Sequence, residues 1–148
     1  MPSTIFFCML SVAGGVLGVK HSFFDWVHRN WARGLLWVAG VRIDVEGLEH
    51  LKSRRPQIIM SNHQSFLDIW VLMSVLPVSL RFVAKSELSE IPLLAGAMRA
   101  AGHVFIDRSR ISNAIDTIRA AGIRMREEGL SLVLFPEGTR SDDGKLGR

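Results

Sequence analysis

Four short apolar runs, separated by longer segments with helical periodicity, constrain the fold of this chain more than any other feature. The runs cover residues 57–61, 79–84, 103–107 and 130–135. Their length favours buried strands. Between them, amphipathic patterns predict helices at residues 66–75, at residues 92–101, and from Ile111 to a stop at Gly129. This alternation predicts an α/β fold with a mostly parallel sheet and helices packed on its faces.

A polar cluster follows the first apolar run, in the stretch NHQSFLD at residues 62–68. Ser65 and Asp68 have the spacing of a capping box, in which the hydroxyl and the carboxylate accept hydrogen bonds from free amides at a helix start. His63 lies two residues before that cap, so its imidazole and the Asp68 carboxylate are expected at the same helix end. A carboxylate beside an imidazole fixes its tautomer and stabilises the imidazolium. On this stretch alone, a solvated His63 and an Asp68 that only caps the helix explain the pattern equally well.

A second polar cluster, FPEGTRS at residues 135–141, follows the last apolar run. Together with NHQSFLD, it resembles the glycerolipid acyltransferase family, specifically the 1-acylglycerol-3-phosphate acyltransferases. The first family motif, Asn-His-x-x-x-x-Asp, matches at Asn62, His63 and Asp68, and the motif Phe-Pro-Glu-Gly-Thr-Arg-Ser matches completely at residues 135–141. A block between them is met by Lys85, Glu87, Leu88, Gly96 and residues 105–108. The resemblance covers residues 41–141.

The resemblance implies an enzyme of phospholipid biosynthesis that moves a fatty acyl group from an acyl thioester to the free hydroxyl of 1-acylglycerol 3-phosphate, a lysophosphatidic acid. The product is phosphatidic acid. In this reaction His63 is the general base and Asp68 orients it. No Gly-x-Ser-x-Gly motif is present, which favours direct attack by the acceptor hydroxyl over a covalent acyl-enzyme. Ser65 beside His63 is a candidate nucleophile, but its position at the helix cap favours a structural role.

The resemblance also assigns the second and third motifs to binding of the acceptor phosphate. Arg108 and Arg140 are the natural ligands, because a guanidinium holds a phosphate through two parallel hydrogen bonds. We expect Gly138 and Thr139 to add backbone amides and a hydroxyl. Lys85 is expected to help there or near the thioester.

Two roles in this cluster stay open at the level of the sequence. Arg108 could instead form a salt bridge with a neighbouring acid, Asp107 or Asp116. Glu137 is counted among the substrate-binding residues, but it could instead serve only to orient Arg140 or His63.

The composition excludes several other classes of function. The net charge of +4 over 148 residues includes no Lys or Arg block of the nucleic-acid-binding type, so we expect no nucleic acid partner. The single Cys8 cannot form an internal disulfide, and the five histidines show no paired metal-ligand spacing. We therefore expect no metal and no cofactor. The acyl thioester enters as a substrate, carried by coenzyme A (acyl-CoA) or by acyl carrier protein.

Residues 1–40 predict a membrane-anchoring helical segment. Residues 5–19 are apolar except for Ser11, but this run is shorter than the about 20 residues needed to span a bilayer comfortably. Apolar residues then recur at helical spacing at positions 23, 27, 31, 35 and 38, and Trp26, Trp31 and Trp37 favour a bilayer interface. We expect attachment to membrane lipid at the cytoplasmic face, the inner membrane if the protein is bacterial. The alternatives are a core helix for the first run and, for the second, a helix that covers the sheet.

Residues 41–148 are expected to form the acyltransferase domain. It begins with VRIDVEG at residues 41–47, where apolar and polar residues alternate and predict a half-buried or edge strand closed by Gly47. Family members usually continue well past the last motif, so we expect this domain to be incomplete at its C-terminus. The alternative functions are transfer to another lysolipid or to glycerol 3-phosphate, and a catalytically inactive fragment that binds membrane lipid.

Overall fold

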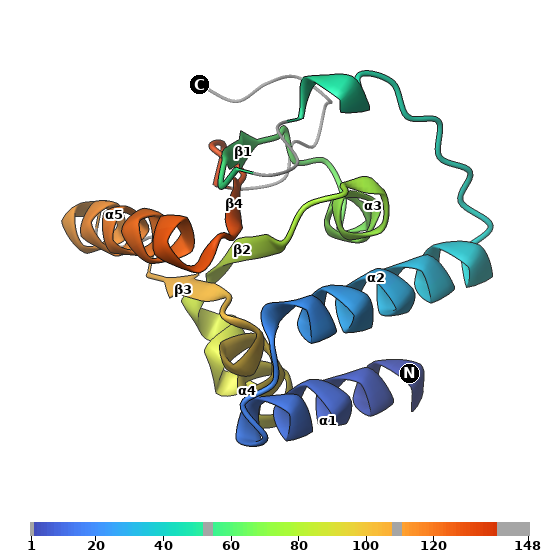
Figure 1. The fold of residues 1–148 in the computed structure, drawn as a ribbon, viewed down its shortest axis with the longest axis horizontal. Coiled ribbons are helices and arrows are strands. Elements are labelled where there is room, and N and C mark those ends of the chain that lie inside the picture. Colours follow the sequence, from blue (N-terminus) through green and yellow to red (C-terminus); the bar gives the residue numbers. More distant parts are fainter. Residues whose placement is uncertain (1, 52–54, 108–110, 139–148) are drawn as a thin grey trace.

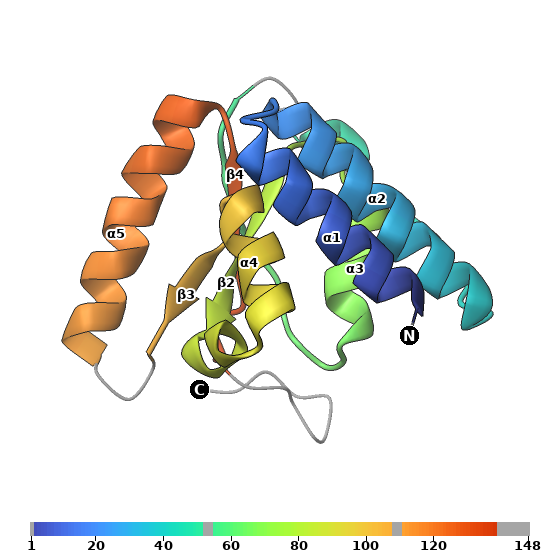
Figure 2. The ribbon, with the colours of Figure 1, turned by 90° about the horizontal axis from the view of Figure 1, so that it is seen from below.

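A computed structural model describes residues 2–51, 55–107 and 111–138. Its centre is a four-stranded sheet with the strand order β1-β4-β2-β3 (Figures 1 and 2). The strands are β1 (Ile58–Met60), β2 (Leu80–Lys85), β3 (Val104–Ile106) and β4 (Ser131–Leu134). All neighbouring strands run parallel, so the carboxyl ends of the four strands lie at one edge. The predicted α/β fold with a parallel sheet is confirmed.

Helices connect the strands and cover both faces of the sheet. They are α3 (Leu67–Val75), α4 (Pro92–Ala101) and α5 (Ile111–Glu128), with the short 3-10 helices η1 (Leu48–His50) and η2 (Ser86–Glu90) in the connections. The prediction for α4 has the observed bounds, because Pro92 suits a first turn and Gly102, at a φ of 88°, closes the last. In Figure 2, α5 lies on one side of the sheet and α3 on the other.

Each face of the sheet has its own apolar core. Phe82 and Val133 pack in the cluster beneath α3, whereas Val83 and Leu132 pack in the cluster beneath α5. Successive side chains of a strand point to opposite faces, so neighbouring residues of β2 and β4 serve different cores. Full burial of such a side chain contributes about 1.5–3 kcal/mol. Apolar packing on both faces therefore fixes the sheet, including the carboxyl ends of its strands.

The N-terminal residues form an antiparallel pair of helices, α1 (Pro2–Val16) and α2 (His21–Val38), on one side of the molecule (Figure 1). α1 packs on α4, and α2 packs on α3. A Cβ atom at Gly15 would lie 2.5 Å from the Cβ atom of Ala100, so glycine permits the close approach of α1 to α4. Within the described residues, no helix combines the length and the apolar character required to cross a membrane.

The most deeply buried side of α2 overlaps only in part with the apolar stripe predicted from the sequence. Its buried residues are Phe24, Val27, Ala32 and Leu36, and only position 27 belongs to the predicted stripe. Apolar residues stand in adjacent pairs along this helix, so the sequence offers two stripes and the contact with α3 selects one. One face of α2 therefore packs on α3 and joins the core beside the sheet through Ala32, while its outer face remains exposed. Trp37 points outward and is 82% exposed.

The predicted strand at residues 41–47 is wrong. This segment pairs with none of the described strands. Val41 and Ile43 are half-buried while Arg42 and Asp44 are exposed, and the apolar positions line a shallow pocket with residues of α2 and α3. The alternation of apolar and polar residues thus reflects an extended chain lying against helices. It does not require pairing in a sheet.

Candidate active site

The side chains of His63 and Asp68 meet at the carboxyl edge of the sheet. His63 lies three residues after β1, and Asp68 lies in the first turn of α3. The distance from His63 Nδ1 to Asp68 Oδ2 is 2.9 Å, so the predicted contact is present. When Nδ1–H donates to the carboxylate, the other ring nitrogen, Nε2, keeps its lone pair and can accept a proton. The His63 side chain is 13% exposed and that of Asp68 29%, so the pair is sheltered but can be reached from outside.

A single oxygen of Asp68 organises the turn that precedes α3. Besides the imidazole, Oδ2 accepts the amide N–H of Gln64 at 2.7 Å and that of Ser65 at 2.9 Å. Burial alone would raise the pKa of Asp68, but the hydrogen bonds from the amides of Ser65 and Gln64 and from His63 lower this pKa below its ordinary value. Asp68 therefore remains a carboxylate at neutral pH.

Ser65 has the capping role that its position favoured. Its Oγ accepts the amide N–H of Leu67 at 3.2 Å, while the carboxylate of Asp68 returns to the Ser65 amide. The predicted capping box thus satisfies amides that have no partner inside the helix. Asp68 consequently has two roles, since the same carboxylate caps α3 and holds the imidazole.

The turn at residues 135–138 brings the last motif against His63. The ring of Phe135 stacks on the imidazole, with centroids 4.1 Å apart and planes inclined by 19°. The N–H of Gly138 donates to the Phe135 carbonyl at 3.0 Å, and the φ of 68° at Gly138 suits a residue without Cβ. Glu137 Oε1 accepts the backbone N–H of His63 at 3.3 Å. Glu137 therefore helps to hold the backbone of His63 in place.

The remaining predicted ligands are only partly described. Lys85 ends β2 at the same edge of the sheet, and its Nζ pairs with Glu87, which lowers the pKa of the Glu87 carboxyl. Arg108, Thr139 and Arg140 lie outside the described residues, so their contacts with phosphate stay predictions. Among the described residues, no group of three or more His, Cys, Asp and Glu side chains is arranged to hold a metal ion.

An apolar cavity of about 290 Å³ lies between α1, α2, α3 and α4. It begins next to the active-site turn at Phe66, which directly follows Ser65. Aromatic side chains from three of these elements line it, together with aliphatic ones; among them are Phe7, Trp31, Phe66, Trp70 and Leu94. Sequence reasoning missed this cavity, although the run IWVLM at residues 69–73, apolar on every side, signalled that α3 has more than one covered face.

The chain resembles known acyltransferases in sequence and in fold. The sequence model of the acyltransferase family matches residues 42–148. A 1-acyl-sn-glycerol-3-phosphate acyltransferase from Limnanthes alba is 41% identical over 112 residues, which are 76% of this chain and 39% of that protein. The beta form from Homo sapiens is 39% identical over 133 residues, 90% of this chain and 46% of that protein.

A similar fold occurs in a solved structure, the crystal structure of the 1-acyl-sn-glycerophosphate (LPA) acyltransferase PlsC from Thermotoga maritima. The two folds agree with a TM-score of 0.70 at 29% sequence identity, over 85% of this chain and 49% of that one. The chain spans less than half the length of each of these relatives.

Proposed function

The chain belongs to the acyltransferase family, and we propose that its site moves a fatty acyl group from an acyl thioester to the free hydroxyl of 1-acylglycerol 3-phosphate, giving phosphatidic acid. The observation that carries this proposal is the 2.9 Å contact between His63 and Asp68. It lies at the carboxyl edge of a parallel sheet, the edge where open α/β folds bind their ligands. The names of the similar proteins support the choice of acceptor.

The chemistry follows from the orientation of the imidazole. Nε2 of His63 takes the proton of the acceptor hydroxyl as the hydroxyl oxygen attacks the thioester carbonyl. The tetrahedral intermediate then collapses, the carbon–sulfur bond breaks, and the imidazolium returns the proton to the leaving thiolate. The charge of Asp68 stabilises the imidazolium between these two steps. Glu137 and Phe135 keep the ring in place through the backbone hydrogen bond and the stacking contact.

The phosphate of the acceptor and the acyl chain of the donor are bound by different parts of the chain. Arg108 and Arg140, with Gly138 and Thr139, bind the acceptor phosphate, and Lys85 assists once its exposed pair with a neighbouring acid opens. The apolar cavity beside Phe66 takes the fatty acyl chain, because it offers an apolar surface next to the catalytic turn. The thioester carrier is coenzyme A or acyl carrier protein, and no cofactor takes part.

The N-terminal helices attach the protein to the cytoplasmic face of a membrane. α1 exposes Ile5, Phe6 and Met9, each more than half exposed. α2 adds the outward-pointing Trp37, and Trp favours the level of the lipid headgroups. Such a surface lies in the interface of the bilayer, within reach of a lysolipid acceptor.

Vesicle sedimentation tests this attachment. The combined change of Ile5, Phe6 and Met9 to Ser should reduce binding to phosphatidylcholine vesicles, because these side chains form the buried contact with lipid. A matched control changes Ile115 and Ile123 to Ser, since both are similarly exposed but lie on α5. Equal sedimentation of the two variants would contradict attachment through α1.

Transfer of a radioactive acyl group tests the function itself. The label should appear in phosphatidic acid when 1-acylglycerol 3-phosphate is the acceptor, and should depend on His63. Faster labelling of glycerol 3-phosphate or of another lysolipid would assign a different acceptor. Binding of lysolipid without any transfer would favour the alternative of a catalytically inactive fragment.

A further inference from the structure

A polar pocket of about 600 Å³ lies at the edge of the sheet opposite to His63 and Asp68. Its lining includes Ser79, which precedes β2, and Ser131, the first residue of β4. Because the strands are parallel, this is their amino edge, whereas His63 and Asp68 lie at the carboxyl edge. None of the described residues assigned to acyl transfer lines the pocket.

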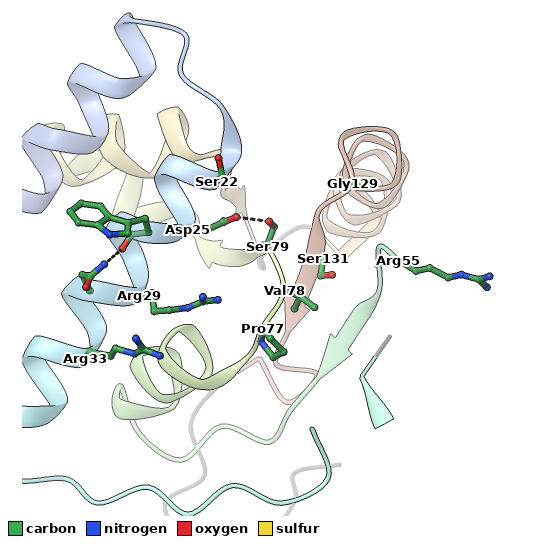
Figure 3. A pocket seen from close by; sticks show the side chains of 12 residues that line it. Ser22, Asp25, Arg29, Arg33, Arg55, Pro77, Val78, Ser79, Gly129 and Ser131 are labelled. Carbon is green, nitrogen blue, oxygen red and sulfur yellow. Dashed lines mark hydrogen bonds between the residues drawn. The ribbon is translucent and has the colours of Figure 1, made fainter. Parts of the chain in front are cut away.

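Two arginines of α2 give this pocket a positive charge. Figure 3 shows Arg29 and Arg33 extending from α2 toward Pro77, while Arg55 on the far side points away. Residues four positions apart on a helix are neighbours, and two like charges at this spacing repel each other. A bound anion would remove that repulsion. Among the described lining residues, only Asp25 is acidic.

Asp25 does not neutralise these arginines, because its carboxylate is already engaged. Its Oδ1 accepts a hydrogen bond from Arg81 Nη1 at 2.8 Å, and its Oδ2 accepts the hydroxyl of Ser79. Arg81 is completely buried, so its charge requires this carboxylate. Within the described part of the chain, no carboxylate forms an ion pair with Arg29 or Arg33.

Arg29 is held in one orientation and still has an unused donor. Its Nη2 donates to the carbonyl of Leu76, the C-cap residue that follows α3, at 3.0 Å. Its Nε–H is buried and has no hydrogen-bond partner among the residues that the structure describes. A buried donor without an acceptor is unfavourable. An oriented guanidinium is suited to an oxyanion, with which it forms charge-assisted hydrogen bonds. The Nε–H itself is buried, so an anion in the pocket would meet the outer end of the guanidinium, which Figure 3 shows extending from α2 toward Pro77.

We propose that the pocket between α2 and the amino ends of β2 and β4 binds a phosphate group through Arg29 and Arg33. A phosphate group has enough oxygens to accept from two guanidinium groups at once. Trp26 lines the same pocket and is 56% exposed, and Trp is typical of the lipid headgroup level. The phosphate is therefore that of an anionic lipid headgroup or free phosphate. This site does not depend on the acyl-transfer reaction.

Titration calorimetry on the whole chain tests the proposal, with inorganic phosphate and a soluble short-chain phosphatidate as the probes. Arg33→Gln should weaken binding at this site about tenfold or more, since one charge-assisted pair is lost. Arg33 is exposed, so its replacement leaves the fold intact, whereas Arg29→Gln also removes the contact with Leu76. Arg119→Gln is the matched control, because Arg119 is an exposed arginine on the distant α5.

A second variant separates this site from the proposed acceptor site. Arg140→Gln should leave binding at the pocket unchanged, whatever it does to acyl transfer. If Arg140→Gln abolished all phosphate binding, or if Arg33→Gln bound both probes as the unchanged protein does, the proposal would be overturned. Tighter binding of the phosphatidate than of inorganic phosphate would assign the site to a lipid headgroup, and equal affinity would assign it to free phosphate.

Discussion

Replacement of Asp68 by Asn separates two roles of a carboxylate beside a histidine that acts as a general base: it fixes the tautomer of the imidazole, and its charge stabilises the imidazolium. A single oxygen, Oδ2, accepts hydrogen bonds from the amides of Gln64 and Ser65 and from His63 Nδ1. The two backbone amides are fixed donors, so in the Asp68→Asn variant the side-chain oxygen must face them and the side-chain NH₂ must point away. The same oxygen then faces the imidazole, and the tautomer with a proton on Nδ1 is retained.

The expected loss is that of the negative charge alone. A hydrogen bond to a charged group contributes about 1.5–3 kcal/mol and one between neutral groups about 0.5–1.5 kcal/mol. The difference of about 1–2 kcal/mol applies to the imidazolium that forms during transfer, which is about 5- to 30-fold in kcat. A reversed tautomer would instead lower kcat about 10⁴-fold.

Steady-state rates of acyl transfer and thermal unfolding measure this prediction. Asp68→Asn should change Tm little, because Asn also caps helices. His63→Ala should lower kcat about 10²- to 10⁴-fold, the range for loss of a general base, while acceptor binding persists. Ser65→Ala is the control, since it removes a cap and costs about 1 kcal/mol of stability but leaves the imidazole in place. A 10⁴-fold loss in Asp68→Asn at unchanged Tm, or no loss at all, would refute the argument from the shared oxygen.

Three further predictions concern pH, packing and the acceptor. Burial, followed by the charge of the buried Arg81, lowers the pKa of His28 from 6.5 to about 4, and burial lowers the pKa of His103 well below 6.5. The unfolded chain therefore binds these protons more strongly, so the free energy of unfolding should fall by about 3 kcal/mol for His28 as the pH drops from 6.5 to 4. A denaturant midpoint that stays constant over this pH range would contradict the shift. Gly15→Ala should lower Tm, because the added methyl group would lie 2.5 Å from the Cβ atom of Ala100 in α4. Gly34→Ala in α2 has open space around the added methyl group and should raise the free energy of unfolding by up to about 1 kcal/mol. Equal changes in stability in the two variants would show that α1 does not pack closely on α4. Arg140→Ala should raise the KM for the acceptor far more than that for the thioester, since a lost charge-assisted pair costs about 1.5–3 kcal/mol, and equal changes in both KM values would exclude the assignment.

Local signals in the sequence were sufficient to place the four strands of the sheet and the helices between them, and to bring His63 and Asp68 to one helix end. Pro92 and Gly102 define the ends of α4 whatever surrounds it, because each restricts or permits backbone angles by itself. The contact between His63 and Asp68 spans five residues. The capping spacing from Ser65 therefore brings the two residues to the same helix end, and the structure shows that their side chains meet there.

The turn at residues 135–138, which contacts His63, is placed there by the order of the strands in the sheet. Glu137 lies 74 residues from His63 in the chain, and it meets the His63 amide because β4 inserts beside β1. Four apolar runs of similar length do not specify which of them become neighbours. The family motifs indicated that these residues share a site, but the hydrogen bond and the stacking of Phe135 follow from the pairing of β1 with β4.

Short-range preferences thus specify most of the helices and strands and place His63 and Asp68 at one helix end, because both depend on backbone angles and on neighbours within a few residues. Contacts between distant segments were needed to establish that residues 41–47 lie against helices, that α2 buries Leu36, and that Arg29 and Arg33 line a pocket. An apolar residue in the sequence indicates a buried side chain, but it does not identify the residues that cover it. A strand, a buried helix face or a charged pocket is defined by its partner, and that partner comes from a distant part of the chain.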